Sequence, residues 1–324
     1  MRLASLTRVK NDGDIIEEFV RYTARFVDAL VVVDNASLDS TRDVLSALHS
    51  EGLPITILDD GFIEGYDWIM TDLVRRVLAQ TDADYLLVLD ADEFVRAPSR
   101  AALEHALSEL APGSHACVPW VTYVPTPNDD AFEQRQLVRI RHRLRVEVPA
   151  FYKVFVSRSF LACPDATLRI GNHGVDDPLE RHRSVELPNV GLAHFPVRSI
   201  SQIQNKGFLG WSSFMAMGYE GGGLAYQWQR VYEHLGTKRD WTASDLFECA
   251  VNYLAAPGID RAPVDLTCDP LRPVERRYAT AVPDIAQTAI AYTRQLARSY
   301  ATLRRENIDL RRALGAARTT LEAS

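Results

Sequence analysis

Apolar residues in the N-terminal third of the chain follow two alternating patterns. Short apolar runs cover residues 3–9, 29–33, 55–58 and 85–89, and the segments between them repeat apolar residues every three or four positions. Short uninterrupted runs are typical of buried strands, and the wider spacing predicts amphipathic helices. The alternation of the two predicts an α/β fold with a mostly parallel sheet and helices on both faces.

Polar residues stand at the end of each predicted strand. In chain order they are Thr7 and Arg8, Asp34 and Asn35, Asp59 and Asp60, and Asp90 and Asp92. The carboxyl ends of parallel strands meet at one edge of a sheet, where folds of this type bind ligands. For any single Asp or Asn the alternative is a turn or a helix cap. Their repetition after four strands favours a ligand site.

The fourth apolar run leads into the acidic segment Asp90-Ala91-Asp92-Glu93-Phe94. Two carboxylates at positions i and i+2 after a strand can converge on one divalent cation. Such a cation can in turn hold the phosphates of a nucleotide. We therefore expect a metal and phosphate site here.

Composition limits the classes of partner. The chain has 324 residues, of which 47% are hydrophobic, and this suffices for one large domain with an appendage. A net charge of −7 argues against broad binding to nucleic acid or anionic membranes. The four cysteines include no C-x-x-C pair, so neither a zinc site nor a disulfide framework is expected. No apolar run approaches the roughly 18 residues of a membrane span or resembles a signal peptide, and we expect a cytoplasmic protein.

Three motifs carry a family resemblance: residues 8–11 with the helix after them, residues 31–41, and residues 89–94. Together they resemble the nucleotide-binding half of GT-A fold glycosyltransferases of the family 2 type. The Asp-Ala-Asp-Glu-Phe form resembles the subgroup related to family 92, in which segments similar to residues 152–156 and 192–199 also occur. The resemblance covers roughly residues 1–235. It implies a Rossmann-like GT-A fold and metal-dependent sugar transfer.

The resemblance also implies roles for single residues. Asp34 would read a uracil-type base beside Thr7 and Arg8. Asp92 would be the principal ligand of Mn²⁺ or Mg²⁺, and His194 a further ligand, although a lone His before Phe-Pro is on chemistry alone more often structural. The implied nucleotide-binding set is Thr7, Arg8, Asn11, Asp34, Asn35 and Asp90, and the implied metal set is Asp90, Asp92 and His194.

An inverting reaction needs a carboxylate that deprotonates the acceptor hydroxyl. The Glu-Asp pattern that family 2 places at the start of a helix is absent in its usual form. Asp176 and Asp177 are the first candidates for this catalytic base, and a surface turn before Pro178 is the alternative for both. The other candidates are Glu93, which is also a candidate second-layer partner of the metal site, Glu180 and Glu220.

A basic segment lies in the second half of the resemblance. It contains Arg135, Arg139, Arg141, His142, Arg143 and Arg145. These side chains suit a phosphate of the donor or of a lipid-linked acceptor, and a solvated strand face is the commoner alternative.

The last forty residues form a helical pattern with heptad spacing. Leu296, Leu303 and Leu310 are seven apart, and a second series contains Tyr300, Asn307, Leu314 and Leu321. Asn307 at an a position, with Glu306 at g and Arg311 at the next e, is typical of parallel two-stranded coiled coils. We expect this helix to form a homodimer or to dock the protein onto a partner protein that carries a similar helix. The alternative is a long helix that packs on its own domain.

The sequence thus predicts three regions. Residues 1–235 form the GT-A domain, with a nucleotide-binding half at 1–98 and an acceptor half at 99–235. Residues 236–283 form a helical segment and a Pro-rich linker, and residues 284–324 a coiled-coil helix. The expected function is transfer of a sugar from a nucleoside diphosphate donor, a UDP-sugar by preference, to a saccharide or glycan-lipid acceptor in polysaccharide or glycoconjugate biosynthesis. The alternatives are a non-catalytic scaffold that assembles through its coiled coil and a phosphatase of the haloacid-dehalogenase type.

Overall fold

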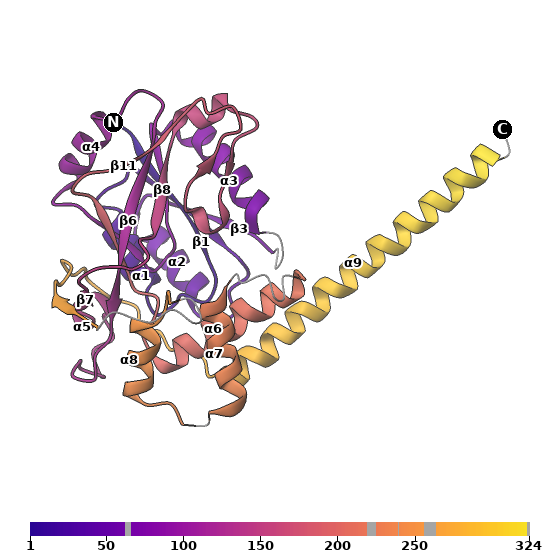
Figure 1. Ribbon diagram of the computed structural model, residues 1–324. Coiled ribbons are helices and arrows are strands. Elements are labelled where there is room, and N and C mark those ends of the chain that lie inside the picture. The colour runs from indigo at the N-terminus through magenta and orange to yellow at the C-terminus, as the bar shows by residue number, and fades with distance from the viewer. Residues whose placement is uncertain (62–65, 219–224, 239, 256–263, 323–324) are drawn as a thin grey trace.

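The computed structural model describes residues 1–61, 66–218, 225–238, 240–255 and 264–322 (Figure 1). Within these ranges a large mixed β-sheet is flanked by helices, and one long C-terminal helix projects away from the body. Glu220, one of the candidate bases, lies outside the described residues.

The N-terminal half of the sheet is parallel. Strand β1 (Leu3–Val9) pairs with β2 (Ala29–Asp34) on one side and with β4 (Tyr85–Val88) on the other, and β2 pairs with β3 (Ile55–Asp59). The four apolar runs of the sequence are these four strands. The predicted α/β fold with alternating strands and helices is confirmed for this half.

Helices cover both faces of the parallel strands. Helices α1 (Ile16–Thr23) and α2 (Thr41–Ser50) pack on one face, and α3 (Tyr66–Thr81) packs on the other. Successive side chains of a strand point to opposite faces. Accordingly Leu3 of β1 belongs to the first hydrophobic core and Leu6 to the second.

The second half of the sheet is largely antiparallel. Strand β8 pairs antiparallel with β4 and β6, and β7 connects β6 to β13. Two further strands, β11 and β12, run parallel to β6, and β12 also pairs with β5. The bounds are β5 (Glu93–Arg96), α4 (Arg100–Ser108), β6 (His115–Val124), α5 (Gln136–Arg139), β7 (His142–Leu144), β8 (Tyr152–Ser157), β9 (Thr167–Leu168), β10 (Val175–Asp176), β11 (Ser184–Glu186), β12 (Gly191–His194) and β13 (Leu266–Cys268).

Strand register brings distant polar residues to one edge. Val9 pairs with Asp34 across β1 and β2, so the loops that follow these strands begin side by side. In the β5–β12 pair, His194 lies opposite Glu93. The amide of Phe195 donates to the carbonyl of Asp92, with a donor–acceptor distance of 2.8 Å. The backbone itself therefore positions His194 next to the end of β4.

Three helices follow β12 and form a small second layer. Helix α6 (Ile200–Ala216) packs along α7 (Tyr226–Thr237), and α8 (Ala243–Val251) contacts β6. Residues from all three contribute to a separate apolar cluster. Figure 1 shows these helices below the sheet, beside the start of α9 (Ile285–Glu322).

Helix α9 has a packed beginning and an exposed continuation. Tyr292 is buried and Leu296 is half-buried, and both pack near Phe208 of α6 and Leu38. Beyond them, Leu303 is 48% exposed and Leu310 is 64% exposed. The projecting part of α9 in Figure 1 thus carries apolar side chains into solvent.

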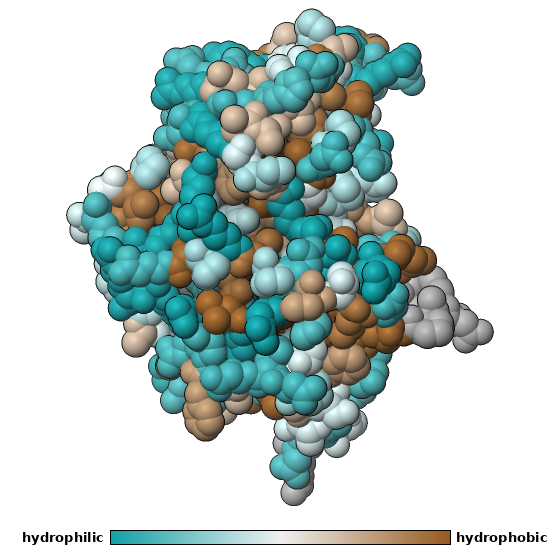
Figure 2. All heavy atoms as spheres, turned by 90° about the vertical axis from the view of Figure 1, so that its left-hand side faces the viewer, coloured by the Kyte–Doolittle hydropathy of each residue, from teal (hydrophilic) through white to brown (hydrophobic). Residues whose placement is uncertain are grey.

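The molecular surface is mixed in character. On the face shown in Figure 2, hydrophilic residues cover most of the area and apolar residues are interspersed among them. Among the described helices, including the long α9, none combines the length and hydropathy that a membrane span requires.

The contact between α6 and α7 depends on a glycine, which yields a stability prediction. A Cβ at Gly207 would lie 2.4 Å from Cγ1 and 2.6 Å from Cβ of Val231, which is buried. Overpacking of this kind typically costs about 1–3 kcal/mol. We expect Gly207→Ala to lower the free energy of unfolding by that amount in urea titrations.

The matched control is Gly236→Ala, in the last turn of α7. A Cβ at Gly236 meets no atom within 4 Å. Because alanine favours helix more than glycine, this variant should be as stable as the wild type or slightly more stable. Equal destabilisation by both substitutions would contradict the close packing of α6 on α7.

Candidate functional site

Asp92, in the turn between β4 and β5, is the centre of the site. Its side chain is only 5% exposed, and three cationic or imidazole groups surround it. The Nζ of Lys206 lies 2.5 Å from Oδ2, Nη1 of Arg198 lies 3.5 Å from Oδ2, and Nε2 of His194 lies 3.8 Å from Oδ1. Burial alone would raise the pKa of Asp92, but Lys206, His194 and Arg198 outweigh it and hold this pKa well below its usual range. The carboxylate is therefore ionised.

His194 is a neutral imidazole in this environment. Burial lowers its pKa to about 3, even though the charge of Asp92 opposes this shift. Its ring lies 4.7 Å from the ring of Trp120 and 5.8 Å from that of Tyr253. Its Nδ1 is buried and has no hydrogen-bond partner among the described residues. A neutral imidazole with an available nitrogen is a metal ligand in chemical terms.

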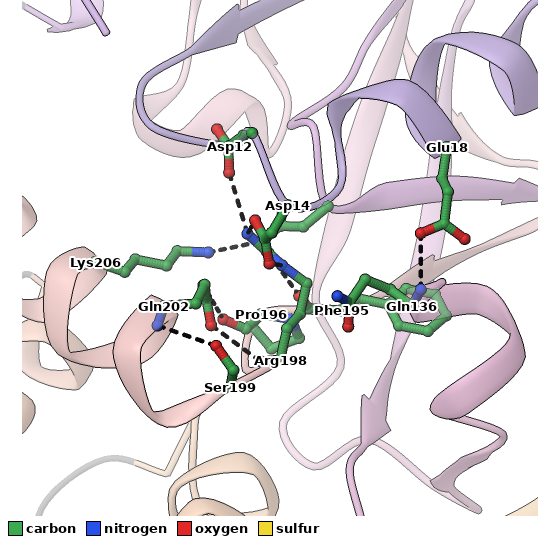
Figure 3. Close-up of polar contacts among 12 residues, drawn as sticks. Asp12, Asp14, Glu18, Gln136, Phe195, Pro196, Arg198, Ser199, Gln202 and Lys206 are labelled. Atoms are coloured by element: carbon green, nitrogen blue, oxygen red, sulfur yellow. Dashed lines mark hydrogen bonds and ion pairs between the residues drawn. The ribbon is translucent and has the colours of Figure 1, made fainter. Parts of the chain in front are cut away.

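Arg198 ties the loop after β1 to Asp92. Its side chain is fully buried, its Nε and Nη2 bind the two carboxylate oxygens of Asp14 at 2.7 and 2.8 Å, and Nη1 donates to the carbonyl of Phe195. Asp12 lies 3.3 Å from Nη2. Figure 3 shows Asp12 and Asp14 on one side of Arg198 and Lys206 of α6 on another. Although burial opposes the charge, these acids raise the pKa of Arg198 above its usual value.

The neighbouring acids form a second ion-pair group around Lys153 of β8. The Nζ of this buried lysine lies 2.7 Å from Oδ2 of Asp90 and 3.3 Å from Oε1 of Glu93. The other oxygen of Glu93 accepts a hydrogen bond from the amide of Asp90. Burial raises the pKa of Glu93 well above its ordinary value, against the opposing charge of Lys153. Asp90, by contrast, has a side chain that is 40% exposed.

The loops after β1 and β2 interlock beside this centre. Asn11 donates its backbone amide to Oγ of Ser37, and its side-chain oxygen accepts from the amide of Leu38 at 2.6 Å. Asp34 is buried and accepts from the amide of Ser37 at 3.1 Å. These bonds fix the loop at whose start Asp34 sits.

The three other expected nucleotide-binding residues differ in their surroundings. Thr7 is fully buried, and its hydroxyl has no hydrogen-bond partner in the described part of the chain. The Nε of Arg8 pairs with Oδ2 of Asp60 at 2.7 Å. The carbonyl of Asn35 accepts from Nζ of Lys10 at 2.7 Å. Arg8 and Asp60, which end β1 and follow β3, thus lie together at the same edge as Asp34.

Helix α9 reaches this loop. The Nζ of Lys10 also contacts Oε1 of Gln295 at 3.1 Å and lies 5.8 Å from the ring of Tyr292. The side-chain amide of Gln295 donates to the carbonyl of Ala36. Burial lowers the pKa of Lys10 to about 8. The first turns of α9 therefore support the loop that follows β2.

Asp176 and Asp177, the first candidates for the base, have their partners outside the Asp92 centre. Asp176 is exposed and pairs with Arg169, whereas Asp177 accepts from the side chain and the backbone amide of Arg181. The hydrogen bond from Arg181 holds the pKa of Asp177 below its usual range. Neither acid shares a hydrogen bond or ion pair with Asp90, Asp92 or His194 within the described ranges.

Asp176, Asp177 and Glu180 line one cavity of about 320 Å³. His173 also lines it, and the ring of His173 lies 5.4 Å from the ring of Trp120, which in turn contacts His194. Two aromatic contacts therefore connect this cavity with the Asp92 centre.

Several residues of the site were given no role by the sequence. These are Lys153, Arg198 and Lys206, together with Asp12 and Asp14. For Lys153 a signal exists: it is the one charged residue within the apolar strand β8. The arginines of the basic segment are largely engaged within the protein instead, since Arg143 binds Asp269, Arg145 binds Asp265 and Arg139 binds the carbonyl of Arg198.

The donor atoms around Asp92 fit a divalent cation in part. Within the described residues, no group of three or more His, Cys, Asp or Glu side chains is arranged to hold a metal ion. The carboxylate of Asp92 and the neutral, partly unpaired imidazole of His194 form a pair of suitable donors. Proteins commonly hold Mg²⁺ through one or two side chains while substrate phosphates and water supply the remaining ligands. Asp92 and His194 fit such a site, and Asp90 is held by Lys153 instead.

No family model matches the chain, and no curated protein matches it. Solved structures do overlap with it in part. TarS of S. aureus in complex with UDP is 14% identical over 74% of this chain and 73% of that one, with a TM-score of 0.39. A mannosyltransferase from Pyrobaculum calidifontis in complex with GDP-Man and Mn²⁺ is 17% identical over 76% and 78%, also with a TM-score of 0.39.

A third overlap is shorter. Glucosyl-3-phosphoglycerate synthase from Mycobacterium tuberculosis, in complex with Mn²⁺, UDP and phosphoglyceric acid, is 16% identical over 37% of this chain and 43% of that one, with a TM-score of 0.28. Similarity this low carries no functional conclusion by itself. The fold and the site define the chain as an α/β protein with a buried, cation-flanked carboxylate at the carboxyl edge of a parallel sheet.

The neutral state of His194 predicts a pH-dependent stability. Because its pKa is about 3 in the folded protein and 6.5 for an unperturbed histidine, the unfolded chain binds an extra proton between these values. Its contribution to stability is complete above pH 6.5 and is lost as the pH falls toward 3, by about 2 kcal/mol between pH 7 and pH 5. Urea titrations of the metal-free protein should show a smaller loss over this range for His194→Gln than for the wild type.

The control is His105→Gln, which changes an exposed histidine of α4. This variant should lose as much stability as the wild type between the two pH values. If His194→Gln also retains the full loss, His194 is not the group that takes up the proton.

Proposed function

We propose that the protein transfers a sugar from a nucleoside diphosphate sugar, a UDP-sugar by preference, to a saccharide or glycan-lipid acceptor in the cytoplasm. The observation that carries this proposal is the buried Asp92 carboxylate, held beside neutral His194 and two cationic side chains at the carboxyl edge of the parallel sheet. A diphosphate leaving group is the kind of ligand that such a mixture of cations and metal donors stabilises. The GT-A fold and the family 2 type belong to the same proposal.

The base and ribose of the donor would lie on the loops after β1 and β2. Asp34 has an acceptor oxygen fixed by the amide of Ser37, which orients the carboxylate. A carboxylate in this position suits the imino proton of a uracil base, because it offers only acceptors. We propose Thr7, Arg8, Asn11 and Asn35 as the surrounding residues, with the exposed Asp90 toward the ribose.

The diphosphate would lie between Asp92 and α6. Mn²⁺ or Mg²⁺ bound by Asp92 and His194 would supply a positive charge that stabilises the leaving diphosphate. Arg198 keeps Asp92 ionised and fixed, because it anchors to Asp14 and to the carbonyl of Phe195. Asp90 would contribute to this site through the carboxylate oxygen that Lys153 does not bind.

We choose the catalytic base by how exposed and how engaged each candidate carboxylate is. Glu93 is fully buried and paired with Lys153, so we propose that it supports the site and does not reach an acceptor. Asp177 is engaged by Arg181, which lowers its basicity. Asp176 is exposed and lines the cavity beside His173, and we propose it as the base of an inverting reaction.

Nucleotide binding separates this enzyme from a scaffold that assembles through α9 and from a phosphatase. Calorimetry with UDP and Mn²⁺ should show binding by the wild type. In Asp92→Asn, UDP binding should no longer depend on Mn²⁺. Asp34→Ala should weaken UDP binding roughly ten- to hundredfold, because a hydrogen bond to a charged group is lost.

The control for this series is Asp82→Asn. Asp82 precedes β4, away from the carboxyl edge of the sheet, and is mostly exposed in a surface pair with Arg158, so this substitution should leave binding unchanged. Failure of the folded wild type to bind UDP with Mn²⁺ would reject the nucleotide-sugar proposal and favour the scaffold.

We also propose that α9 forms a parallel two-stranded coiled coil with a second copy of the chain. The support is the series of exposed apolar residues Tyr300, Leu303, Leu310 and Leu314 on the projecting part of the helix. Glu306 of one copy and Arg311 of the other have opposite charges at g and e positions, and paired Asn307 side chains would set the register.

Truncation after residue 297 tests this assembly while keeping Tyr292, Gln295 and Leu296 in place. We expect light scattering to show a monomer, with about half the mass measured for the full-length dimer, and UDP binding to be retained. Leu303→Asp together with Leu310→Asp should have the same effect, because two charges in the seam cannot be buried. An unchanged mass for both variants would refute self-association through α9.

A further inference from the structure

The Asp92 carboxylate has two sides with different partners. Oδ1 faces Nε2 of His194 at 3.8 Å, which is too long for a hydrogen bond. Oδ2 carries Lys206 at 2.5 Å and Arg198 at 3.5 Å. The side toward His194 is therefore open to a cation, while the other side is already occupied by two positive charges.

These two positive charges differ in how firmly they are held. Arg198 is fully buried and makes paired bonds to Asp14 and a further bond to a backbone carbonyl. Lys206 has a side chain that is 25% exposed, and its ammonium is held chiefly by the ion pair with Asp92. Its second partner is Tyr253, whose side chain is hydrogen-bonded to it and whose ring centre lies 5.6 Å from Nζ. Lys206 therefore has fewer partners than Arg198, and it stands on a flexible four-carbon stem.

A divalent cation between Asp92 and His194 would lie close to the ammonium of Lys206. Like charges in a buried site repel strongly, because the surroundings screen them poorly. A diphosphate removes this conflict, since its oxygens accept hydrogen bonds from an ammonium group. Without a ligand the site therefore favours the ion pair, and with cation and diphosphate bound it favours a lysine on the phosphate.

We propose that Lys206 is an internal counter-cation of Asp92 that a divalent cation displaces, and that the displaced Lys206 binds the diphosphate of the donor. The first half of this inference rests on the proposed cation site at Asp92 and His194, and the second half rests also on the proposed nucleotide donor. Its consequence is positive coupling: cation and nucleotide each bind weakly alone and strengthen one another, because the binding of both moves the same side chain.

The first test measures Mn²⁺ binding without nucleotide, through the electron paramagnetic resonance signal of free Mn²⁺. Lys206→Gln removes the competing charge, so this variant should bind Mn²⁺ roughly tenfold more tightly than the wild type. Lys206→Arg keeps a positive charge at this position and should remain close to the wild type. Equal or weaker binding by Lys206→Gln would overturn the proposal.

The control is Lys238→Gln, which removes an exposed lysine paired with Asp245 on the surface. It changes the net charge by the same amount as Lys206→Gln. It therefore separates the effect of the charge beside Asp92 from the effect of net charge on Mn²⁺ binding. Circular dichroism of each variant checks that the total helix content is unchanged. A tighter Mn²⁺ affinity in Lys238→Gln as large as that in Lys206→Gln would also overturn the proposal.

The second test measures coupling. In the wild type, saturating UDP should increase Mn²⁺ affinity, and this increase should shrink roughly tenfold in Lys206→Gln. An undiminished increase in the variant would overturn the phosphate-binding role of Lys206. If UDP binds neither protein, the proposed function fails, while the nucleotide-free measurement still decides whether Lys206 competes for Asp92.

Discussion

The charge of one buried carboxylate organises this protein. Asp92 lies almost out of contact with water, and an ionised acid there is stable only because Lys206 and Arg198 compensate its charge. Arg198 must in turn be compensated, and Asp14 and Asp12 do this from the loop after β1. Charge balance at a single position therefore connects β1, β4, β12 and α6, which are the elements that surround the proposed nucleotide.

The need for charge balance explains why some groups of the site are buried with several partners and others are partly exposed. Arg198 and Lys153 are buried cations with several partners each, and they hold the acids after β4 in fixed positions. Lys206 and Asp90 are partly exposed and face the side from which a ligand would approach. A site of this kind is preorganised for a charged ligand, yet it keeps two groups that can exchange partners when the ligand binds.

The fold of the parallel half could be predicted from the sequence because its strands are short apolar runs, and three of them, β1, β2 and β4, are buried on both faces. The polar strand ends could be predicted for the same reason, since parallel strands share an edge. The partners of Asp92 could not be predicted. Arg198 and Asp14 are 184 positions apart, and tertiary packing brings them together. The burial of Glu93 could not be predicted either. Its acidic motif suggests an accessible carboxylate, but in the structure the side chain points inward and pairs with Lys153.

The C-terminal helix likewise combines a readable and an unreadable part. Its heptad spacing is visible in the sequence, whereas the contacts of Tyr292 and Gln295 with the loop after β2 depend on tertiary packing. The most direct test of the proposed site is a crystal structure of the protein with UDP and Mn²⁺. We predict a cation bound by Asp92 and His194, with the diphosphate next to Lys206 and the uracil at Asp34. A structure in which UDP lies elsewhere, while Lys206 remains on Asp92, would contradict this prediction.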